Sequence, residues 1–161
     1  MEPTTPYDPD RVVLYKRNRF QSRLPKAYRY TASHFWLDEQ SPGLWRVGFT
    51  RFATRMLGEI VEHGFEAAGR PVAAGQAVKV GQTIGWVEGF KALTELYCVA
   101  DGTFEGGNPA LDADPALVAN DPYYAGWLYL VRGVPEPNSV AVEGYIGILD
   151  ATIDTMLGKE G

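Results

Sequence analysis

The sequence predicts a mostly β protein, a small barrel or sandwich of short strands with a helix at its C-terminal end. Short apolar segments recur from Tyr30 onward, and glycine, proline, aspartate and asparagine separate them. Residues 141–158 then change to the three- and four-residue spacing of an amphipathic helix. A chain of 161 residues is long enough for one compact domain with terminal extensions.

The N-terminal segment, residues 1–29, is predicted to be a basic, loosely ordered extension. It starts with MEPTTPYDPD, which is rich in proline and polar residues. Residues 11–30 then hold seven of the fifteen lysine and arginine residues and no acid. The remaining eight basic and twenty acidic residues give the rest of the chain a formal charge of −12. The protein is therefore expected to be an acidic body with a basic arm.

The β domain is predicted to span residues 30–134. Its strands are expected at residues 35–37, 44–49, 59–63, 77–80, 83–88, 93–99, 102–106 and 127–132. Between the second and third of these, TRFATRMLG predicts one or two helical turns that stop at Gly58.

The last segment, residues 135–161, is predicted to be a helix packed on the same domain. Its apolar residues recur at helical spacing, and Gly158 follows as a stop. Gly144 and Gly147 weaken its first turns by about 1 kcal/mol each relative to alanine.

Composition limits the classes of function. The formal net charge of −5 gives no overall basic footprint for nucleic acid, and no apolar run approaches the ~20 residues that span a bilayer. The single cysteine, Cys98, excludes an internal disulfide and a cysteine-based metal cluster. Glu2, Asp8 and Asp10 precede the basic run, and no apolar stretch follows it, so a secretory signal is not expected. We expect a cytoplasmic protein, or one of the mitochondrial matrix if the source is eukaryotic.

One lysine stands between two strand-like segments. In GWVEGFKALTELYCVADG, residues 85–102, the segments TIGWVE and LTELYCV flank the tetrapeptide Gly89-Phe90-Lys91-Ala92. This spacing predicts a β-hairpin with Lys91 at its tip. An exposed turn lets a modifying enzyme reach the amine, but the same spacing also suits an ordinary solvated lysine. Spacing alone leaves both interpretations open.

Four motifs resemble those of the glycine cleavage system H protein family, in family order. The stretch around Lys91 is similar to the family's Val-Glu-Ser-Val-Lys-Ala segment. The others are YTASHFWL at 30–37, VGFTRFATRMLGEIV at 47–61 and DPALVANDPYYAGWLYLVR at 114–132. The resemblance implies a lipoyl-domain-like barrel-sandwich hybrid.

The resemblance also implies a carrier that is not itself an enzyme, with lipoate bound covalently to Lys91. Its implied partners are a pyridoxal-phosphate glycine decarboxylase, an aminomethyltransferase, a dihydrolipoyl dehydrogenase and the enzyme that attaches lipoate. The carrier would shuttle the aminomethyl group of glycine among the first three. No catalytic residue, metal site, nucleic-acid partner or membrane contact is expected, and the protein is expected to be a monomer.

Other residues take their expected roles from the same resemblance. Glu88 occupies the position that the lipoate-attaching enzyme uses, and Gly89, Phe90, Ala92 and Glu95 complete the hairpin tip and its recognition surface. Gly75 and Gly102 are expected in tight turns, where glycine adopts backbone angles that other residues resist. Without the resemblance, Glu88 would be interpreted as an ordinary solvent-exposed carboxylate on a strand.

The chain departs from the family pattern in two places. Phe35 replaces the glutamate that follows the histidine of the opening motif, near the cleft where the loaded arm is thought to dock. Ser33, His34 and Phe35 are thus candidate docking residues. Phe35 could offer a cation–π contact of about 0.5–1 kcal/mol if it is exposed, and loss of the docking function is an equally open alternative. Gly89-Phe90 replaces Ser-Val before the lysine, and the glycine is expected to loosen the turn.

These departures keep other functions open. The chain could be a lipoylated H-like carrier for another oxidoreductase, or a member of a lipoyl relay. It could also be an unmodified interaction module that has kept the fold. Biotin attachment is a weaker alternative, because biotinyl sites place methionine on both sides of the lysine, and Lys91 lies between Phe90 and Ala92.

Overall fold

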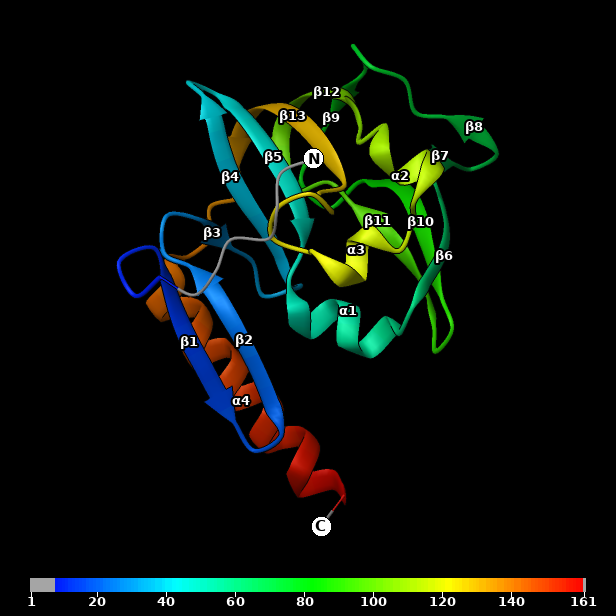
Figure 1. Cartoon of the computed structure of the whole chain (residues 1–161). Coiled ribbons are helices and arrows are strands. Elements are labelled where there is room, and N and C mark those ends of the chain that lie inside the picture. Colours follow the sequence, from blue (N-terminus) through cyan, green and yellow to red (C-terminus); the bar gives the residue numbers. More distant parts are fainter. Residues whose placement is uncertain (1–7, 161) are drawn as a thin grey trace.

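The computed structural model describes residues 8–160, with side chains as far as residue 158. It confirms the predicted fold class: most of the regular structure is β, with short internal helices and a long C-terminal helix (Figure 1). The main sheet has six antiparallel strands in the order β3-β4-β5-β13-β12-β9. Their bounds are Arg29–Tyr30 (β3), Phe35–Ser41 (β4), Leu44–Phe49 (β5), Tyr129–Pro135 (β13), Ala100–Gly107 (β12) and Ala77–Val78 (β9).

A smaller sheet carries the hairpin that was predicted from the sequence. It has three antiparallel strands in the order β11 (Leu93–Tyr97), β10 (Thr83–Gly89) and β6 (Ile60–Gly64). Alternate residues of both sheets, among them Phe49, Val87, Leu96 and Val131, enter one buried apolar cluster. A separate two-stranded hairpin, β7 (Glu66–Ala67) with β8 (Arg70–Pro71), extends from the smaller sheet.

Helix α1 (Arg51–Leu57) links the two sheets, as the TRFATRMLG pattern predicted. Thr50 caps its start, since its hydroxyl accepts from the backbone N–H of Ala53. Gly58 ends it at φ 79° and ψ −163°, a combination that only glycine adopts readily. Two short helices, α2 (Ala110–Ala113) and α3 (Leu117–Asn120), follow β12 and were not predicted.

The N-terminal segment differs from the loosely ordered extension that the sequence suggested. Residues 1–7 lie outside the described part of the chain, but β1 (Val12–Arg17) and β2 (Phe20–Pro25) form an antiparallel hairpin. Asn18 in its turn takes φ 54°, which asparagine tolerates. The expectation failed because the basic residues alternate with buried ones: Phe20, Ser22 and Leu24 all face the protein interior.

The C-terminal helix α4 (Val142–Glu160) confirms the predicted amphipathic helix, and it packs against the β1–β2 hairpin (Figure 1). Tyr145, Leu149 and Ile153 are buried in a second apolar cluster, which also contains Phe20 and Phe52. Polar contacts hold the hairpin to the helix. The Tyr15 hydroxyl donates to Asp150 at 2.7 Å, and the Arg17 guanidinium binds both oxygens of Asp154.

Candidate functional site

Lys91 lies in the two-residue loop of the β10–β11 hairpin. Glu88 and Leu93 are the last paired residues, and the N–H of Gly89 donates to the carbonyl of Ala92 at 2.9 Å. Phe90 and Lys91 form the loop itself, and both side chains are exposed. The structure therefore places the lysine at the exposed tip where the spacing predicted it.

The loop is held rigidly by the segment between α1 and β6. The N–H of Lys91 donates to the carbonyl of Leu57, and the N–H of Phe90 donates to that of Glu59, both at 2.9 Å. Gly89 is buried, and a Cβ at its position would lie 2.2 Å from the Leu57 carbonyl oxygen. The expectation that Gly89 loosens the turn is therefore wrong, because its missing side chain lets the loop pack closely on α1.

The Lys91 side chain lies across the end of α1. A Cβ added to Gly58 would be 3.0 Å from the Lys91 Cγ, and the Lys91 Nζ donates to the Arg55 carbonyl at 3.4 Å. Because the amine is exposed and a backbone carbonyl accepts from it, an acyl group could be attached without disturbing the core. Sequence reasoning identified Gly58 as a helix stop and missed this contact.

Exposed apolar residues lie on the segments next to the lysine. Phe90 is 73% exposed and Leu93 is 68% exposed, and neither contributes to a buried cluster. Met56 on α1 and Val61 on β6 are also exposed apolar residues near this end of the smaller sheet. Exposed apolar residues gathered at one tip are typical of a surface that contacts a partner.

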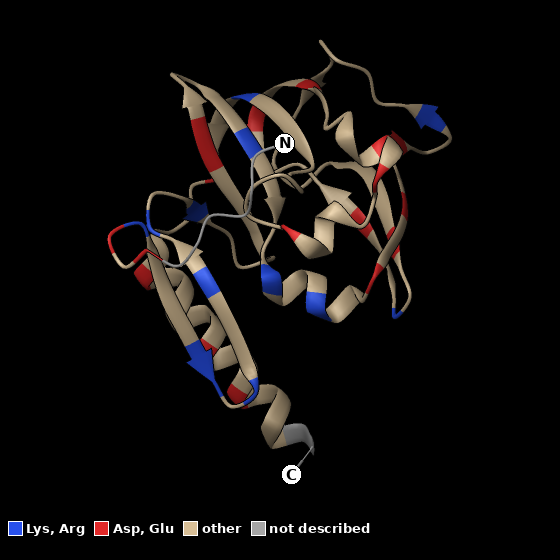
Figure 2. Cartoon of the chain, in the orientation of Figure 1, with Lys and Arg blue, Asp and Glu red and all other residues tan. Residues whose placement is uncertain are grey.

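Carboxylates occupy the outer face of the smaller sheet. Glu88 is paired in register with Glu62 on β6, so two like charges face each other across adjacent strands. Glu95 accepts from the hydroxyls of Tyr97, at 3.0 Å, and Thr83, at 3.5 Å. Figure 2 shows acidic residues on these strands, whereas lysine and arginine mark α1 and the β1–β2 hairpin.

The three candidate docking residues have different environments. Ser33 is exposed, and its hydroxyl shares a hydrogen bond with Thr31. The Nδ1 of His34 contacts the hydroxyl of Tyr145 at 2.8 Å, and burial lowers the pKa of His34 to about 4. Phe35 is 2% exposed and stacks on Phe49 in the core. Of the two alternatives for Phe35, the cation–π contact is excluded, because its ring is buried and presents no face to solvent.

The two glycines predicted in turns have different roles. Gly75 does lie in a turn, at φ 92°, where its N–H donates to the Phe104 carbonyl. Gly102 lies inside strand β12 opposite Gly133, not in a turn. A Cβ on Gly102 would be 1.9 Å from the Arg132 carbonyl oxygen, so glycine is needed there for the close approach of two strands.

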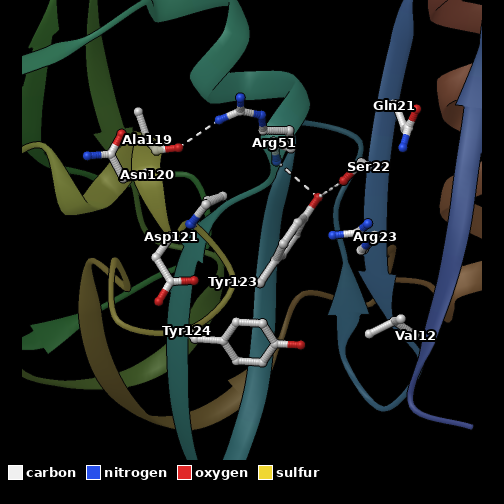
Figure 3. Close-up of a pocket in the computed structure, with 11 residues that line it drawn as sticks. Val12, Gln21, Ser22, Arg23, Arg51, Ala119, Asn120, Asp121, Tyr123 and Tyr124 are labelled. Atoms are coloured by element: carbon white, nitrogen blue, oxygen red, sulfur yellow. Dashed lines mark hydrogen bonds between the residues drawn. The ribbon is translucent and has the colours of Figure 1, made fainter. Parts of the chain in front are cut away.

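A cavity of about 390 Å³ opens where the N-terminal hairpin meets the body (Figure 3). Some of its polar groups are hydrogen-bonded to one another: the Tyr123 hydroxyl contacts Ser22 and accepts from the Arg51 N–H, while the Arg51 guanidinium donates to the Ala119 carbonyl. None of the predicted site residues lines it. We interpret it as the space left where the N-terminal hairpin packs against the rest of the protein.

Within residues 8–160, no group of three or more histidine, cysteine, aspartate or glutamate side chains could hold a metal ion. Over the same residues, no helix has the length and apolar character needed to cross a membrane.

The family model and the relatives that this chain matches point to the same protein family. The family model described as glycine cleavage H-protein matches residues 28–142. The glycine cleavage system H protein of Mycobacterium leprae is 34% identical over 139 residues, which are 86% of this chain and 93% of that protein. The protein of the same name from Mycobacterium bovis is 39% identical over 131 residues, 81% of this chain and 92% of that one.

A solved structure shows the same fold. The crystal structure of a glycine cleavage system H protein from Mycobacterium marinum superposes with a TM-score of 0.67 at 32% identity, covering 77% of this chain and 97% of that one. The family match begins after the β1–β2 hairpin and ends at the first residue of α4. On these matches, the chain belongs to the glycine cleavage H-protein family.

Proposed function

We propose that the protein is a lipoate-bearing carrier of the glycine cleavage system, with lipoate joined through an amide to the Nζ of Lys91. The observation that carries the proposal is the hairpin tip: the lysine amine is exposed, while two backbone hydrogen bonds to Leu57 and Glu59 fix the loop beneath it. A fixed loop presents the base of the lysine side chain to an enzyme in one geometry, and the flexible side chain carries the amine outward. The acylated Nζ would keep an N–H able to donate to the Arg55 carbonyl.

In this role the chain positions an arm and leaves the chemistry to the arm and its partners. The dithiolane of lipoate supplies a two-electron acceptor that also carries the one-carbon amine unit of glycine. The partners would be a pyridoxal-phosphate glycine decarboxylase, an aminomethyltransferase, a dihydrolipoyl dehydrogenase and a lipoate-attaching enzyme. The protein would act as their shared cosubstrate, without a catalytic residue of its own, in the cytoplasm or the mitochondrial matrix.

The surface around the tip suits short-lived contacts with several partners. Phe90 and Leu93 offer apolar area, and Glu88, Glu62 and Glu95 favour a partner with basic groups. Long-range attraction between an acidic body and basic partners speeds encounter without requiring a tight complex.

A lipoylated carrier for a different oxidoreductase is the second candidate. It is favoured by Phe35, whose ring is buried where the resemblance places a glutamate, so this position offers no acid to a protonated aminomethyl group. The two candidates share lipoylation at Lys91 and differ in the partner that loads the arm.

The test is intact-mass spectrometry after incubation with a lipoate-attaching enzyme, ATP and lipoate. We expect one lipoyl group on the wild type, none on Lys91→Arg, and one on the matched control Lys79→Arg, which changes another exposed lysine. Glycine-dependent loading by a decarboxylase then separates the two candidates. A wild type that stays unmodified with several lipoylating enzymes would leave only the unmodified interaction module.

A further inference from the structure

Another pocket lies on the outer face of the smaller sheet, beside the turn of the β7–β8 hairpin. Its volume is about 350 Å³, within the range of small-ligand sites. One wall is the turn itself, residues 66–69, and the other wall belongs to strands β10 and β11. The strand residues that line it are Thr83, Gly85, Trp86 and Glu95, and we call the whole set the Trp86 pocket.

The indole of Trp86 is fixed in the pocket wall and leans toward β6. Trp86 is paired in register with Gly64 on β6 and with Glu95 on β11. A Cβ on Gly64 would lie 2.8 Å from the indole Nε1, so the ring covers that glycine. The indole N–H donates to the Glu66 carboxylate at 3.1 Å. The ring therefore has one carboxylate at its edge and a second on the neighbouring strand.

The two carboxylates give the Trp86 pocket a negative charge that no side chain of its lining balances. Among the described residues, neither Glu66 nor Glu95 forms an ion pair. Glu95 accepts instead from the neutral hydroxyls of Tyr97 and Thr83, and Glu66 accepts from the indole. Each carboxylate uses one oxygen for these bonds, and its other oxygen is available to a donor from outside.

A guanidinium group matches this pocket better than an ammonium group does. A guanidinium is planar, so it can lie against the Trp86 ring in a cation–π contact while its five N–H donors spread toward acceptors on different strands. The acceptors here are Glu66 on β7 and Glu95 on β11. An ammonium is a compact and strongly hydrated point charge, which loses more hydration on entering a pocket. The chemistry of the pocket therefore favours arginine over lysine.

The Trp86 pocket is within reach of a partner that covers Lys91. Trp86 precedes Lys91 by five residues along the same hairpin, on the order of 15 Å at ~3.3 Å per residue. An interface of standard size covers about 800 Å² on each partner, a patch roughly 30 Å across. A partner centred on the hairpin tip therefore extends as far as the pocket.

We propose that the Trp86 pocket receives an arginine side chain of the enzyme that attaches lipoate to Lys91. The proposal rests on lipoylation of Lys91, as proposed above. An enzyme that meets the unmodified chain has no arm to bind, so the protein surface beside the lysine must supply its affinity and its choice among the lysines. Arginine is enriched in protein interfaces, and a charged pocket at the edge of the contact fixes the register of the two proteins.

Indole N–H resonances measure the pocket directly, without an enzyme. The chain has four tryptophans, so isotope-labelled tryptophan gives four indole peaks, and Trp86→Phe assigns one of them. We expect Nα-acetylarginine amide to shift the Trp86 peak saturably, because a guanidinium bound to Glu66 perturbs the hydrogen bond of the indole. Nα-acetylcitrulline amide, which is neutral and of nearly the same shape, should leave the peak unmoved. Nα-acetyllysine amide should bind more weakly than the arginine compound.

Removing either carboxylate charge should weaken this binding. Glu66→Gln and Glu95→Gln should each lower the affinity for the arginine amide by about two- to five-fold, the range for one exposed charge contact. Glutamine can still accept the hydrogen bonds that the glutamates accept from the indole and the hydroxyls. Glu143→Gln, which changes an exposed residue on α4, is the matched control and should bind as the wild type does.

Lipoylation kinetics test the proposed occupant. Glu66→Gln and Glu95→Gln should each raise the KM of the attaching enzyme for the protein by about two- to five-fold. Neither should change kcat, because the pocket does not contact the reacting amine. The arginine amide should raise the apparent KM of the wild type and have little effect on the variant that carries both substitutions. The citrulline amide should have no effect on either protein.

Each negative result has a distinct meaning. If no lipoyl mass is added to the wild type, the proposed function fails, and the attaching enzyme as occupant fails with it. If lipoate is attached but the arginine amide does not move the Trp86 peak, or the citrulline amide moves it equally, the pocket proposal is overturned and the proposed function stands. Wild-type KM values in both glutamine variants would have the same meaning. A Trp86 peak that shifts with protein concentration alone would assign the pocket to a second copy of the chain and also overturn the proposal.

Discussion

Gly58 and Lys91 lie in contact across the end of α1: a Cβ on Gly58 would be 3.0 Å from the Lys91 Cγ. Gly58 also has φ 79° and ψ −163°, and its N–H caps the helix by donating to the Thr54 carbonyl at 2.9 Å. One glycine thus ends the helix and makes room for the lysine that is proposed to carry the arm.

Substituting Gly58 should impair both stability and modification. We expect Gly58→Ala to lower the free energy of unfolding by about 1–3 kcal/mol, because alanine is strained in that backbone conformation. The added methyl group should also displace the Lys91 side chain and slow lipoylation. Urea unfolding and the initial rate of lipoyl mass gain measure the two effects.

Gly43→Ala is the control for this prediction. Gly43 has the same φ of 79°, but a Cβ there would meet nothing within 4 Å. Gly43→Ala should therefore lose stability and keep the wild-type lipoylation rate. Equal slowing in both variants would show that the Gly58 contact does not matter for modification.

Phe90 should contribute to recognition and little to folding. Its side chain is 73% exposed beside Lys91, so Phe90→Ser should change the free energy of unfolding by no more than about 0.5 kcal/mol. If the lipoylating enzyme buries this ring, its loss should slow modification about tenfold. Steady-state lipoylation kinetics give the comparison.

Val134→Ser is the matched variant for Phe90→Ser, since Val134 is 70% exposed on β13. It should match the wild type in lipoylation. The recognition role of Phe90 is rejected if both serine variants are modified at the wild-type rate.

Glu62 and Glu88 face each other across β6 and β10, and this arrangement should reduce stability. Like charges directly opposite in an antiparallel pair destabilise a sheet, by up to about 1 kcal/mol. We expect Glu62→Gln to raise the free energy of unfolding in low salt, with the gain shrinking in 1 M salt as screening increases.

A double-mutant cycle with Glu88→Gln isolates this repulsion. The second substitution should stabilise less when the first is already present. The rate of lipoylation should distinguish the roles of the two residues. Glu88→Gln should slow lipoylation, and Glu62→Gln should leave its rate unchanged. Additive stability changes would mean that the two carboxylates do not interact.

The sequence predicted the smaller sheet, α1 and α4 well, because their apolar spacing and their turn and stop residues are local signals. It missed the β1–β2 hairpin, whose stability depends on distant partners: Tyr15 on Asp150 and Phe20 on Phe52. A run of basic residues concealed the alternation of buried Phe20, Ser22 and Leu24.

In the candidate site too, features with a local sequence signal were predicted, and features that depend on distant residues were missed. The position of Lys91 at a turn follows from the flanking strands, and it was predicted. The contacts of Lys91 with Gly58 and Arg55 join segments more than thirty residues apart, and no local pattern encodes them. The burial of Phe35 depends on Phe49 in the neighbouring strand, so the sequence alone left a cation–π contact and a loss of docking equally open.

His34 should make stability depend on pH. It lies at φ 70°, contacts the Phe52 ring and the Tyr145 hydroxyl, and burial lowers its pKa from 6.5 to about 4. The unfolded chain therefore binds a proton at this residue at a higher pH than the folded protein does. The stabilisation from the buried neutral imidazole is complete above about pH 6.5 and is lost as the pH falls toward 4. At pH 5 this loss is on the order of 2 kcal/mol of unfolding free energy.

His34→Asn tests this contribution, because asparagine tolerates positive φ, can contact the Tyr145 hydroxyl and does not titrate. The difference in unfolding free energy between wild type and variant should shrink between pH 7 and pH 5, with the wild type losing more stability. Subtracting the variant removes the titration of the carboxylates that the two proteins share. Parallel pH profiles from urea unfolding would show that His34 titrates alike in the folded and unfolded states, contrary to its burial against Phe52 and Tyr145.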